Sequence, residues 1–406
     1  MNRPPMPNHQ FAIVGLGVVN GRALGMSSRA LQAEAARLAI ADAGLRPRQV
    51  DGAINGMGSP GSMPGGGGWN DTFARVLGLP INFYWTVARG GTGGHIGMIA
   101  ATRALELGIA NYVVVACGEA GWSLAHGLIG SQTGHSKRRT MRGNSLLGVE
   151  LLGFSQAASA ASFHAFFASR HMHEYGTTAR QFGAVAVSLR QWALLNPEAQ
   201  MYDRPITIDD YLNSRWVVEP YRLFDCCLQS DAGVAVVLTT AERARDLPRP
   251  PVYVVGQGFG EHAREAWWDK TNYTKLDVAP AKAAAFEQAG IELKDVDVAE
   301  FYDCFTGEVI FQLEDYGWCA KGEGGPFVEA GNIAPGGTIP VNTGGGLMSG
   351  FYLFDYTGLA EGVRQLRGEA GDRQVKDAEI ALVTGHGGEM VIPEMCSTHA
   401  CTVLAR

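Results

Sequence analysis

The sequence predicts an α/β protein built from two halves that repeat one another, and three observations support this. Each half opens with an apolar run followed by Gly-x-Gly, at Phe11–Val14 and at Val252–Val255. Each half then has a helical pattern that ends in glycine, Gly44 in the first half and Gly290 in the second, 246 residues apart. Later in each half a glycine-rich turn leads into an apolar helix and a strand. Alternating strands and helices predict buried, mostly parallel sheets covered by helices.

Length and composition indicate the domain organisation. With 406 residues and 46% hydrophobic content, the chain is long enough for two cores, because single cores stop growing near roughly 250 to 300 residues. We predict an N-terminal half at residues 1–245 and a C-terminal half at residues 246–406. The polar, aromatic-rich stretch from about 121 to 221 has no counterpart in the second half, so we predict that it is an inserted lid or loop domain. It contains an expected helix, Thr178–Leu195, that starts with a capping box.

Charge and cysteine usage exclude several classes of function. The net charge is −7 and no block of five or more lysines or arginines is present, so we expect no nucleic-acid partner. No stretch approaches the ~18 apolar residues of a membrane span, and the first ten residues lack the apolar core of a signal peptide. The seven cysteines form no CxxC pair, which favours reduced thiols and a cytoplasmic location.

Three short motifs have simpler explanations than a cofactor or metal site. Gly15-Leu-Gly17 is not a dinucleotide-binding loop, because the same turn recurs at Gly256-Gln-Gly258 and duplication explains both. We interpret each as a tight turn that ends a buried strand. His171-Met-His173 places two rings about 200° apart on a helix, so they do not converge on a metal. Adjacent Cys226 and Cys227 indicate packing in a strand.

Three glycine-rich or aromatic segments are harder to explain by packing alone. They are Val87–Gly93, Phe301–Phe305 and Asn342–Tyr352, and each follows or precedes a predicted strand. Ligands collect in the crevices outside strand ends of α/β sheets. Glycine also allows the backbone to approach a substrate closely. We therefore expect these segments to form the functional site.

The order of these and neighbouring segments resembles the sterol-carrier-protein-type thiolases over nearly the whole chain. The stretches that carry the resemblance are His173–Thr177, Asn196-Pro197, Asp225–Asp231 and Asn342–Leu359. The resemblance implies a thiolase-like five-layered αβαβα sandwich built from two duplicated halves, normally assembled as a homodimer. This agrees with the duplication inferred from the residues themselves.

The sequence departs from those thiolases at three positions. Gly90 occupies the place of the nucleophilic cysteine, which thiolases hold at a helix N-terminus where the macrodipole favours the thiolate. Tyr302, in Tyr-Asp-Cys-Phe, replaces the histidine of the family motif His-Asp-Cys-Phe. Tyr352 replaces the histidine of a Gly-His-Pro motif. With tyrosine at both histidine positions, the sequence resembles the thiolase-related aldolases that cleave steroid side chains.

This resemblance implies a carbon–carbon lyase. Its reaction is retro-aldol cleavage of a β-hydroxyacyl-CoA, a steroid with a tertiary 17-hydroxyl, to a ketone and a short acyl-CoA such as propionyl-CoA. The reaction needs a base for the hydroxyl and an acid for the enolate. We expect Tyr302 and Tyr352 to fill both roles, with Tyr352 as the base; the reversed assignment stays open.

The resemblance also suggests which groups hold the thioester oxygen. Backbone N–H groups at Gly90 and in a turn containing His386 and Gly387 are the expected oxyanion donors. For His386 the alternative is a turn histidine that faces solvent. We expect no metal and no cofactor, because the CoA thioester is itself the substrate.

The sequence leaves two other functions open. The chain could be a thiolase-like acyltransferase that uses another cysteine, Cys304 being the nearest candidate. It could also be a non-catalytic subunit that binds acyl-CoA. Because steroid aldolases of this family work with a small OB-fold partner bearing a zinc ribbon, the resemblance implies a heteromeric complex.

Overall fold

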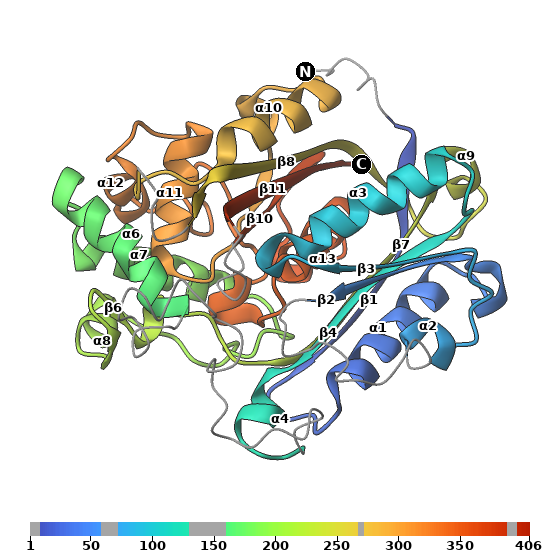
Figure 1. Cartoon of the computed structure of the whole chain (residues 1–406). Coiled ribbons are helices and arrows are strands. Elements are labelled where there is room, and N and C mark those ends of the chain that lie inside the picture. The colour runs from blue at the N-terminus through green and yellow to red at the C-terminus, as the bar shows by residue number, and fades with distance from the viewer. Residues whose placement is uncertain (1–8, 58–71, 130–159, 267–271, 388–395) are drawn as a thin grey trace.

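A nine-stranded sheet forms the centre of the computed structural model, which describes residues 9–57, 72–129, 160–266, 272–387 and 396–406 (Figure 1). The strands are β1 (Phe11–Gly21), β2 (Gly52–Met57), β3 (Phe83–Ala88), β4 (Val113–Ala120), β7 (Asp231–Thr240), β8 (Val252–Ala266), β9 (Val298–Glu300), β10 (Ile380–Gly387) and β11 (Cys396–Ala405). Their spatial order is β3-β2-β4-β7-β1-β8-β11-β10-β9. A separate hairpin joins β5 (Trp216–Val218) and β6 (Tyr221–Arg222).

The helices of the described residues surround and divide this sheet. They are α1 (Ser28–Asp42), α2 (Phe73–Val76), α3 (Gly93–Glu106), α4 (Gly121–Ala125), α6 (Ala160–Tyr175), α7 (Ala179–Ala193), α8 (Ile208–Leu212), α9 (Ala241–Ala244), α10 (Val278–Ala289), α11 (Thr306–Tyr316), α12 (Gly324–Glu329) and α13 (Tyr356–Arg367). None of these helices is long and apolar enough to cross a membrane.

The sheet consists of two half-sheets that mirror each other. The order β2-β4-β7-β1 in the first half corresponds to β9-β10-β11-β8 in the second. The half-sheets meet where β1 and β8 pair antiparallel over only three residues, Phe11–Ile13 against Val252–Val254. Helix α1 packs on the first half-sheet as α10 packs on the second. The duplication predicted from the sequence is therefore confirmed. The expected mostly parallel pairing is wrong, because β7 and β11 each run antiparallel to both of their neighbours.

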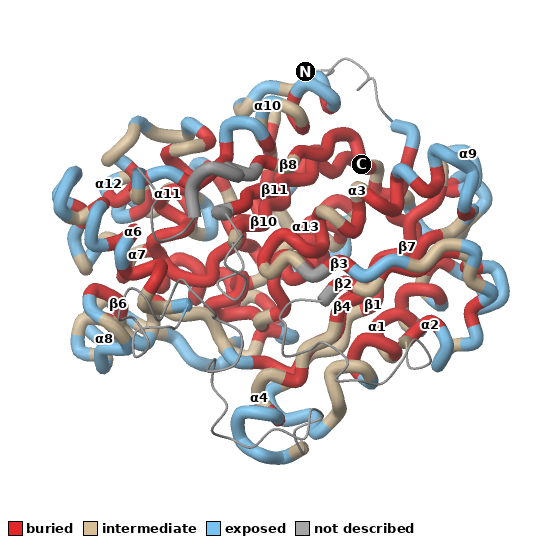
Figure 2. Tube along the Cα trace, viewed as in Figure 1, coloured by how far each residue is buried: buried red, intermediate tan, exposed pale blue. Residues whose placement is uncertain are grey.

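The elements stack in five layers. Helix α1 covers one outer face and α10 the other, while α3 and α13 each contact strands of both half-sheets and so lie between them (Figure 1). Ten of the fourteen residues of α3 are buried, and Figure 2 shows buried residues concentrated in the strands and in these inner helices. The predicted αβαβα sandwich is confirmed.

The Gly-x-Gly pairs do not end their strands, so that part of the prediction is wrong. Both pairs lie inside β1 and β8, which continue beyond them. A Cβ on Gly15 would lie 2.1 Å from the carbonyl oxygen of Ala39, and one on Gly256 would lie 2.0 Å from that of Ala285. The glycines are needed because α1 and α10 pack their backbones directly against the strands.

The central stretch of the chain contains α4, α6, α7, α8 and the hairpin. The expected helix is present as α7, with Thr178 as its N-cap and the Thr178–Gln181 capping box formed. Residues 130–159 of the expected insertion at 121–221 lie outside the described residues. The division at residue 245 stays a prediction; α9 ends at Ala244 and β8 begins at Val252.

Candidate active site

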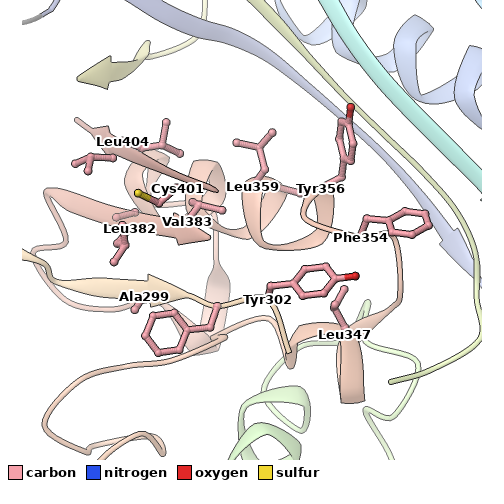
Figure 3. Close-up of a cluster of buried hydrophobic side chains, with 14 of the residues drawn as sticks. Ala299, Tyr302, Leu347, Phe354, Tyr356, Leu359, Leu382, Val383, Cys401 and Leu404 are labelled. Atoms are coloured by element: carbon pink, nitrogen blue, oxygen red, sulfur yellow. The ribbon is translucent and has the colours of Figure 1, made fainter. Parts of the chain in front are cut away.

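Tyr302 lies just beyond the carboxyl end of β9 and is held there by its backbone. Its N–H donates to Oγ1 of Thr384 on β10 at 3.0 Å, and its carbonyl accepts from Nε2 of Gln312 on α11 at 2.9 Å. Thr384 Oγ1 in turn donates to Gln312 Oε1. The side chain is only 6% exposed. Figure 3 shows its hydroxyl directed toward the space between Leu347 and Phe354.

Tyr352 belongs to a segment that is distant in sequence from Tyr302. The side chains of Asn342 and Asp303 join the two segments by hydrogen bonds. Asn342, with a left-handed backbone (φ 53°), forms hydrogen bonds through its amide oxygen and nitrogen with the backbone of Phe301. The Asp303 carboxylate accepts from the N–H groups of Leu347 and Met348, in the π-helical turn Gly346–Gly350. Tyr352 follows that turn, so the two sequence motifs become one structural unit.

The two phenols interact with each other in a largely buried setting. Tyr352 is half-buried, and its N–H donates to Oγ of Ser230 at 2.9 Å. Burial raises the pKa of both phenols well above the usual value of about 10. A hydrogen bond between the two side chains raises the pKa of Tyr302 further and opposes the rise of the pKa of Tyr352. The two phenols therefore lie close enough to influence each other's ionisation.

The glycines before α3 form another side of the site. Gly90 has φ +50° and opens the 3-10 turn Gly90–Thr92 that leads into α3. A Cβ on Gly91 would lie 2.5 Å from Cζ of Tyr302 and 2.1 Å from the carbonyl oxygen of His386. A Cβ on Gly387 would lie 3.1 Å from the backbone nitrogen of Gly91. The positions named from the sequence therefore gather around the Tyr302 ring.

His386 does not lie in a turn, so that prediction and its solvent-facing alternative are both wrong. It belongs to β10, pairs with His399 on β11, and is fully buried. The strand continues through Gly387 because β11 supplies antiparallel partners up to Thr398. Helix α3 begins at Gly93, so the positive end of its dipole lies beside the amides of the preceding turn Gly90–Thr92.

Comparison with known proteins places this site in a family. A family profile described as "Thiolase C-terminal domain-like" matches residues 260–406. The chain is 37% identical to the "Steroid side-chain-cleaving aldolase" of Thermomonospora curvata, over 93% of this chain and 95% of that one. It is 36% identical to the "17-hydroxy-3-oxo-4-pregnene-20-carboxyl-CoA lyase" of Mycobacterium tuberculosis, over 94% and 98%. The chain belongs to the steroid side-chain-cleaving aldolases of the thiolase superfamily.

Solved structures support the same placement. The "Ltp2-ChsH2(DUF35) aldolase" matches with a TM-score of 0.82 and 33% identity over 98% of both chains. Human mitochondrial 3-ketoacyl-CoA thiolase matches with a TM-score of 0.68 and 15% identity over 98% of both chains, which shows the shared fold. This aldolase family member therefore keeps the thiolase architecture.

Behind the tyrosines of this aldolase family member lies a buried chain of ionisable groups that the sequence did not reveal. Cys304 Sγ is 3.9 Å from Nε2 of His164, and Nδ1 of His164 is 2.6 Å from Oε1 of Glu308. Oε2 of Glu308 is 3.7 Å from Nε2 of His386. Burial, followed by the charge of Glu308, raises the pKa of Cys304 well above its usual value. The thiol is therefore held in its neutral form.

Cys226 and Cys227 also differ from the prediction, because neither lies in a strand of the sheet. Cys226 forms an isolated bridge with Phe305, and the N–H of Cys227 donates to the carbonyl of Cys304 at 3.0 Å. Burial raises the pKa of Cys227, which is close enough to contribute to the pKa values of both tyrosines. Within the described residues, no cluster of three or more histidine, cysteine or acidic side chains is arranged to hold a metal ion.

Proposed function

We propose that this protein is a carbon–carbon lyase that cleaves a β-hydroxyacyl-CoA by a retro-aldol reaction. The observation that carries the proposal is the pair of hydrogen-bonded phenols, Tyr302 and Tyr352, beside the glycine amides before α3. A retro-aldol step converts an alkoxide and a thioester into a ketone and a thioester enolate. It needs proton transfer and oxyanion donors but no covalent intermediate.

The proposed reaction moves one proton and one electron pair. Tyr352 takes the proton of the substrate hydroxyl as the bond between the hydroxyl-bearing carbon and the α-carbon of the thioester breaks. The electron pair of that bond becomes the enolate, stabilised by N–H groups at Gly90 and Gly387. Tyr302 supports the enolate, and a proton returned to the α-carbon completes the short acyl-CoA.

The state of the phenols sets a condition on this reaction. Because burial raises both pKa values, neither phenol is ionised near neutral pH before substrate reacts. A phenol that accepts a proton must therefore pass on its own proton in the same step. We assign this role to Tyr352, because its interaction with Tyr302 opposes the rise of its pKa.

For the substrate, we propose a steroid CoA thioester with a tertiary hydroxyl at carbon 17. The support is the name of the Mycobacterium tuberculosis relative, a lyase of 17-hydroxy-3-oxo-4-pregnene-20-carboxyl-CoA. Breaking the bond in that compound between the hydroxyl-bearing carbon 17 and the α-carbon of the thioester gives a 17-ketosteroid and propionyl-CoA. No cofactor enters the proposed reaction.

For the assembly, we propose a homodimer that binds a second protein. The structural relative is a complex with a DUF35 protein, which supports a partner of that class; an OB-fold with a zinc ribbon is the partner expected from the family. A cytoplasmic location is proposed from the reduced thiols predicted by the cysteine pattern.

An acyltransferase that uses Cys304 is the alternative that the geometry addresses most directly. Cys304, His164 and Glu308 follow one another in the order nucleophile, base and orienting carboxylate. However, the raised pKa of Cys304 disfavours the thiolate that acyl transfer needs. The other alternative, a non-catalytic acyl-CoA-binding subunit, predicts that both tyrosines are dispensable.

The test is a product analysis of the purified chain with its DUF35-type partner. A steroid C22 CoA thioester carrying the 17-hydroxyl is incubated with the complex, and ketone and acyl-CoA products are identified by mass spectrometry. We expect a 17-ketosteroid and propionyl-CoA, and no cleavage of the same thioester without the 17-hydroxyl. Cleavage of both thioesters would contradict a retro-aldol reaction.

A further inference from the structure

Glu119, at the carboxyl end of β4, is an acidic residue to which the proposed reaction assigns no role. Side chains alternate between the two faces of a strand. Val114 and Ala116 belong to the core beneath α1, whereas Val115 and Cys117 belong to the core that also contains Tyr302, and Val115 packs against Gly97 of α3. Glu119 continues the second row, so it lies on the face of β4 that is turned toward the active site.

The Glu119 carboxyl group has an unusual environment. Its Oε2 is buried and makes no hydrogen bond in the described part of the chain. The neighbouring Asp231 differs, because it accepts from the N–H of Leu24 and from both the N–H and the hydroxyl of Ser123. Burying an acidic oxygen without a donor is costly, so such a group commonly has a role beyond folding.

The backbone places Glu119 next to the segment that holds Tyr352. In the β4–β7 ladder Ala120 pairs with Asp231, and Ser230 is the residue before Asp231. Ser230 accepts the N–H of Tyr352 through its hydroxyl at 2.9 Å and the N–H of Gly121 through its carbonyl at 2.9 Å. Ser230 therefore links the end of β4 to Tyr352. The negative charge of Glu119 contributes to the raised pKa of Tyr352.

We propose that Glu119 is a positioning residue for Tyr352 that accepts the phenolic proton when Tyr352 takes the proton of the substrate hydroxyl. This inference rests on the proposed retro-aldol function. The substrate proton moves to the oxygen of Tyr352, and the Tyr352 proton passes through one water molecule to the Glu119 carboxylate, because no direct hydrogen bond joins these two side chains in the described part of the chain. After the carbon–carbon bond breaks, Glu119 returns its proton through Tyr352 to the enolate carbon. All residues then regain their starting protonation states.

The ionisation of Glu119 suits this role. Burial, followed by the charge of Asp231, raises its pKa to about 7, so the carboxylate form that accepts a proton prevails only above that pH. Other titratable groups around the pair are Asp231 on β7, Cys227 in the loop before it, and Tyr302 and Cys304 after β9. The two thiols and Tyr302 have raised pKa values and stay neutral near pH 7.

The experiment compares Glu119→Gln and Glu119→Asp with the wild-type complex over pH 5.5 to 9, using the steroid thioester. For Glu119→Gln we expect kcat to fall roughly 10²-fold, with KM unchanged, and the decrease of kcat below about pH 7 to disappear. Glu119→Asp should recover part of kcat and keep the decrease. Glu34→Gln removes a surface carboxylate that pairs with Arg37 on α1 and should behave as wild type.

Each outcome decides the inference. Wild-type kcat in Glu119→Gln, or a lower kcat whose decrease below pH 7 persists, overturns it; Asp303 is then the leading source of that decrease, because burial raises its pKa also to about 7. Equal losses in both variants with a lowered melting temperature show a structural role only. A wild-type complex that cleaves nothing overturns the proposed function, and the role of Glu119 falls with it.

Discussion

Removing the hydroxyl of Tyr302 or Tyr352 is the perturbation that most sharply separates chemistry from structure. Each phenylalanine variant keeps the aromatic ring. The ring at position 352 therefore still packs against Phe354, whose ring centroid lies 5.0 Å from that of Tyr352. The folded state loses one phenol–phenol hydrogen bond, worth about 1 kcal/mol. The transition state loses a proton carrier worth about 10²- to 10⁴-fold in rate, which is about 2.7 to 5.4 kcal/mol. The loss of turnover should therefore far exceed the loss of stability.

Tyr356 provides a matched control four residues beyond Tyr352. It is 1% exposed, and its hydroxyl makes no hydrogen bond in the region that the structure describes. Tyr356→Phe should leave turnover unchanged. It should also leave the free energy of unfolding unchanged or raise it, by up to about 1 kcal/mol, because an unsatisfied buried hydroxyl is removed.

The assay is steady-state release of the short acyl-CoA by the complex, with stability measured by denaturant unfolding. Because the two phenols share one hydrogen bond, the double variant should lose much less than the product of the two single losses. Near-full activity in both single variants would show that the two phenols carry no proton and would favour the acyl-CoA-binding subunit. A loss of activity no larger than that of the Tyr356→Phe control would lead to the same conclusion.

Three further changes test other parts of the account. Cys304→Ser should keep cleavage largely intact, because a retro-aldol step needs no thiolate; a loss of several orders of magnitude in a folded variant would revive the acyltransferase. Gly91→Ala should abolish turnover, because the new methyl would lie 2.1 Å from the His386 carbonyl oxygen and 2.5 Å from Cζ of Tyr302 and would displace both; unchanged kinetics would mean that the position of these groups is unimportant. Gly15→Ala should lower the free energy of unfolding by about 1–3 kcal/mol, since its methyl meets the Ala39 carbonyl; an unchanged denaturation midpoint would contradict the packing explanation.

Local signals explain how much of the fold was predictable. Gly44 and Gly290 both adopt left-handed conformations at the ends of equivalent helices, and a helix C-cap is visible in sequence. The strand apolar runs were equally clear. The role of Gly15 and Gly256 was not predictable, because close packing of a helix on a strand depends on partners about 25 to 30 residues away.

The site was predictable only where a family motif marked it. Tyr302 and Tyr352 could be found because they replace histidines in recognisable motifs. His386 was misplaced because its neighbouring glycines indicate a turn, whereas pairing with β11 keeps the segment in a strand. Glu119 and His164 gave no signal, since their importance comes from burial and from contacts across more than 100 residues of sequence.

The dependence of cleavage on free CoA distinguishes a retro-aldol reaction from thiolytic cleavage. Thiolytic cleavage consumes one CoA for each bond broken, whereas a retro-aldol reaction already releases its short product as the CoA thioester. With the 17-hydroxy steroid thioester and no free CoA, we predict ketone and propionyl-CoA in equal amounts. Cleavage that begins only when free CoA is added, with an acyl group found on Cys304, would instead identify the protein as a thiolase-like acyltransferase.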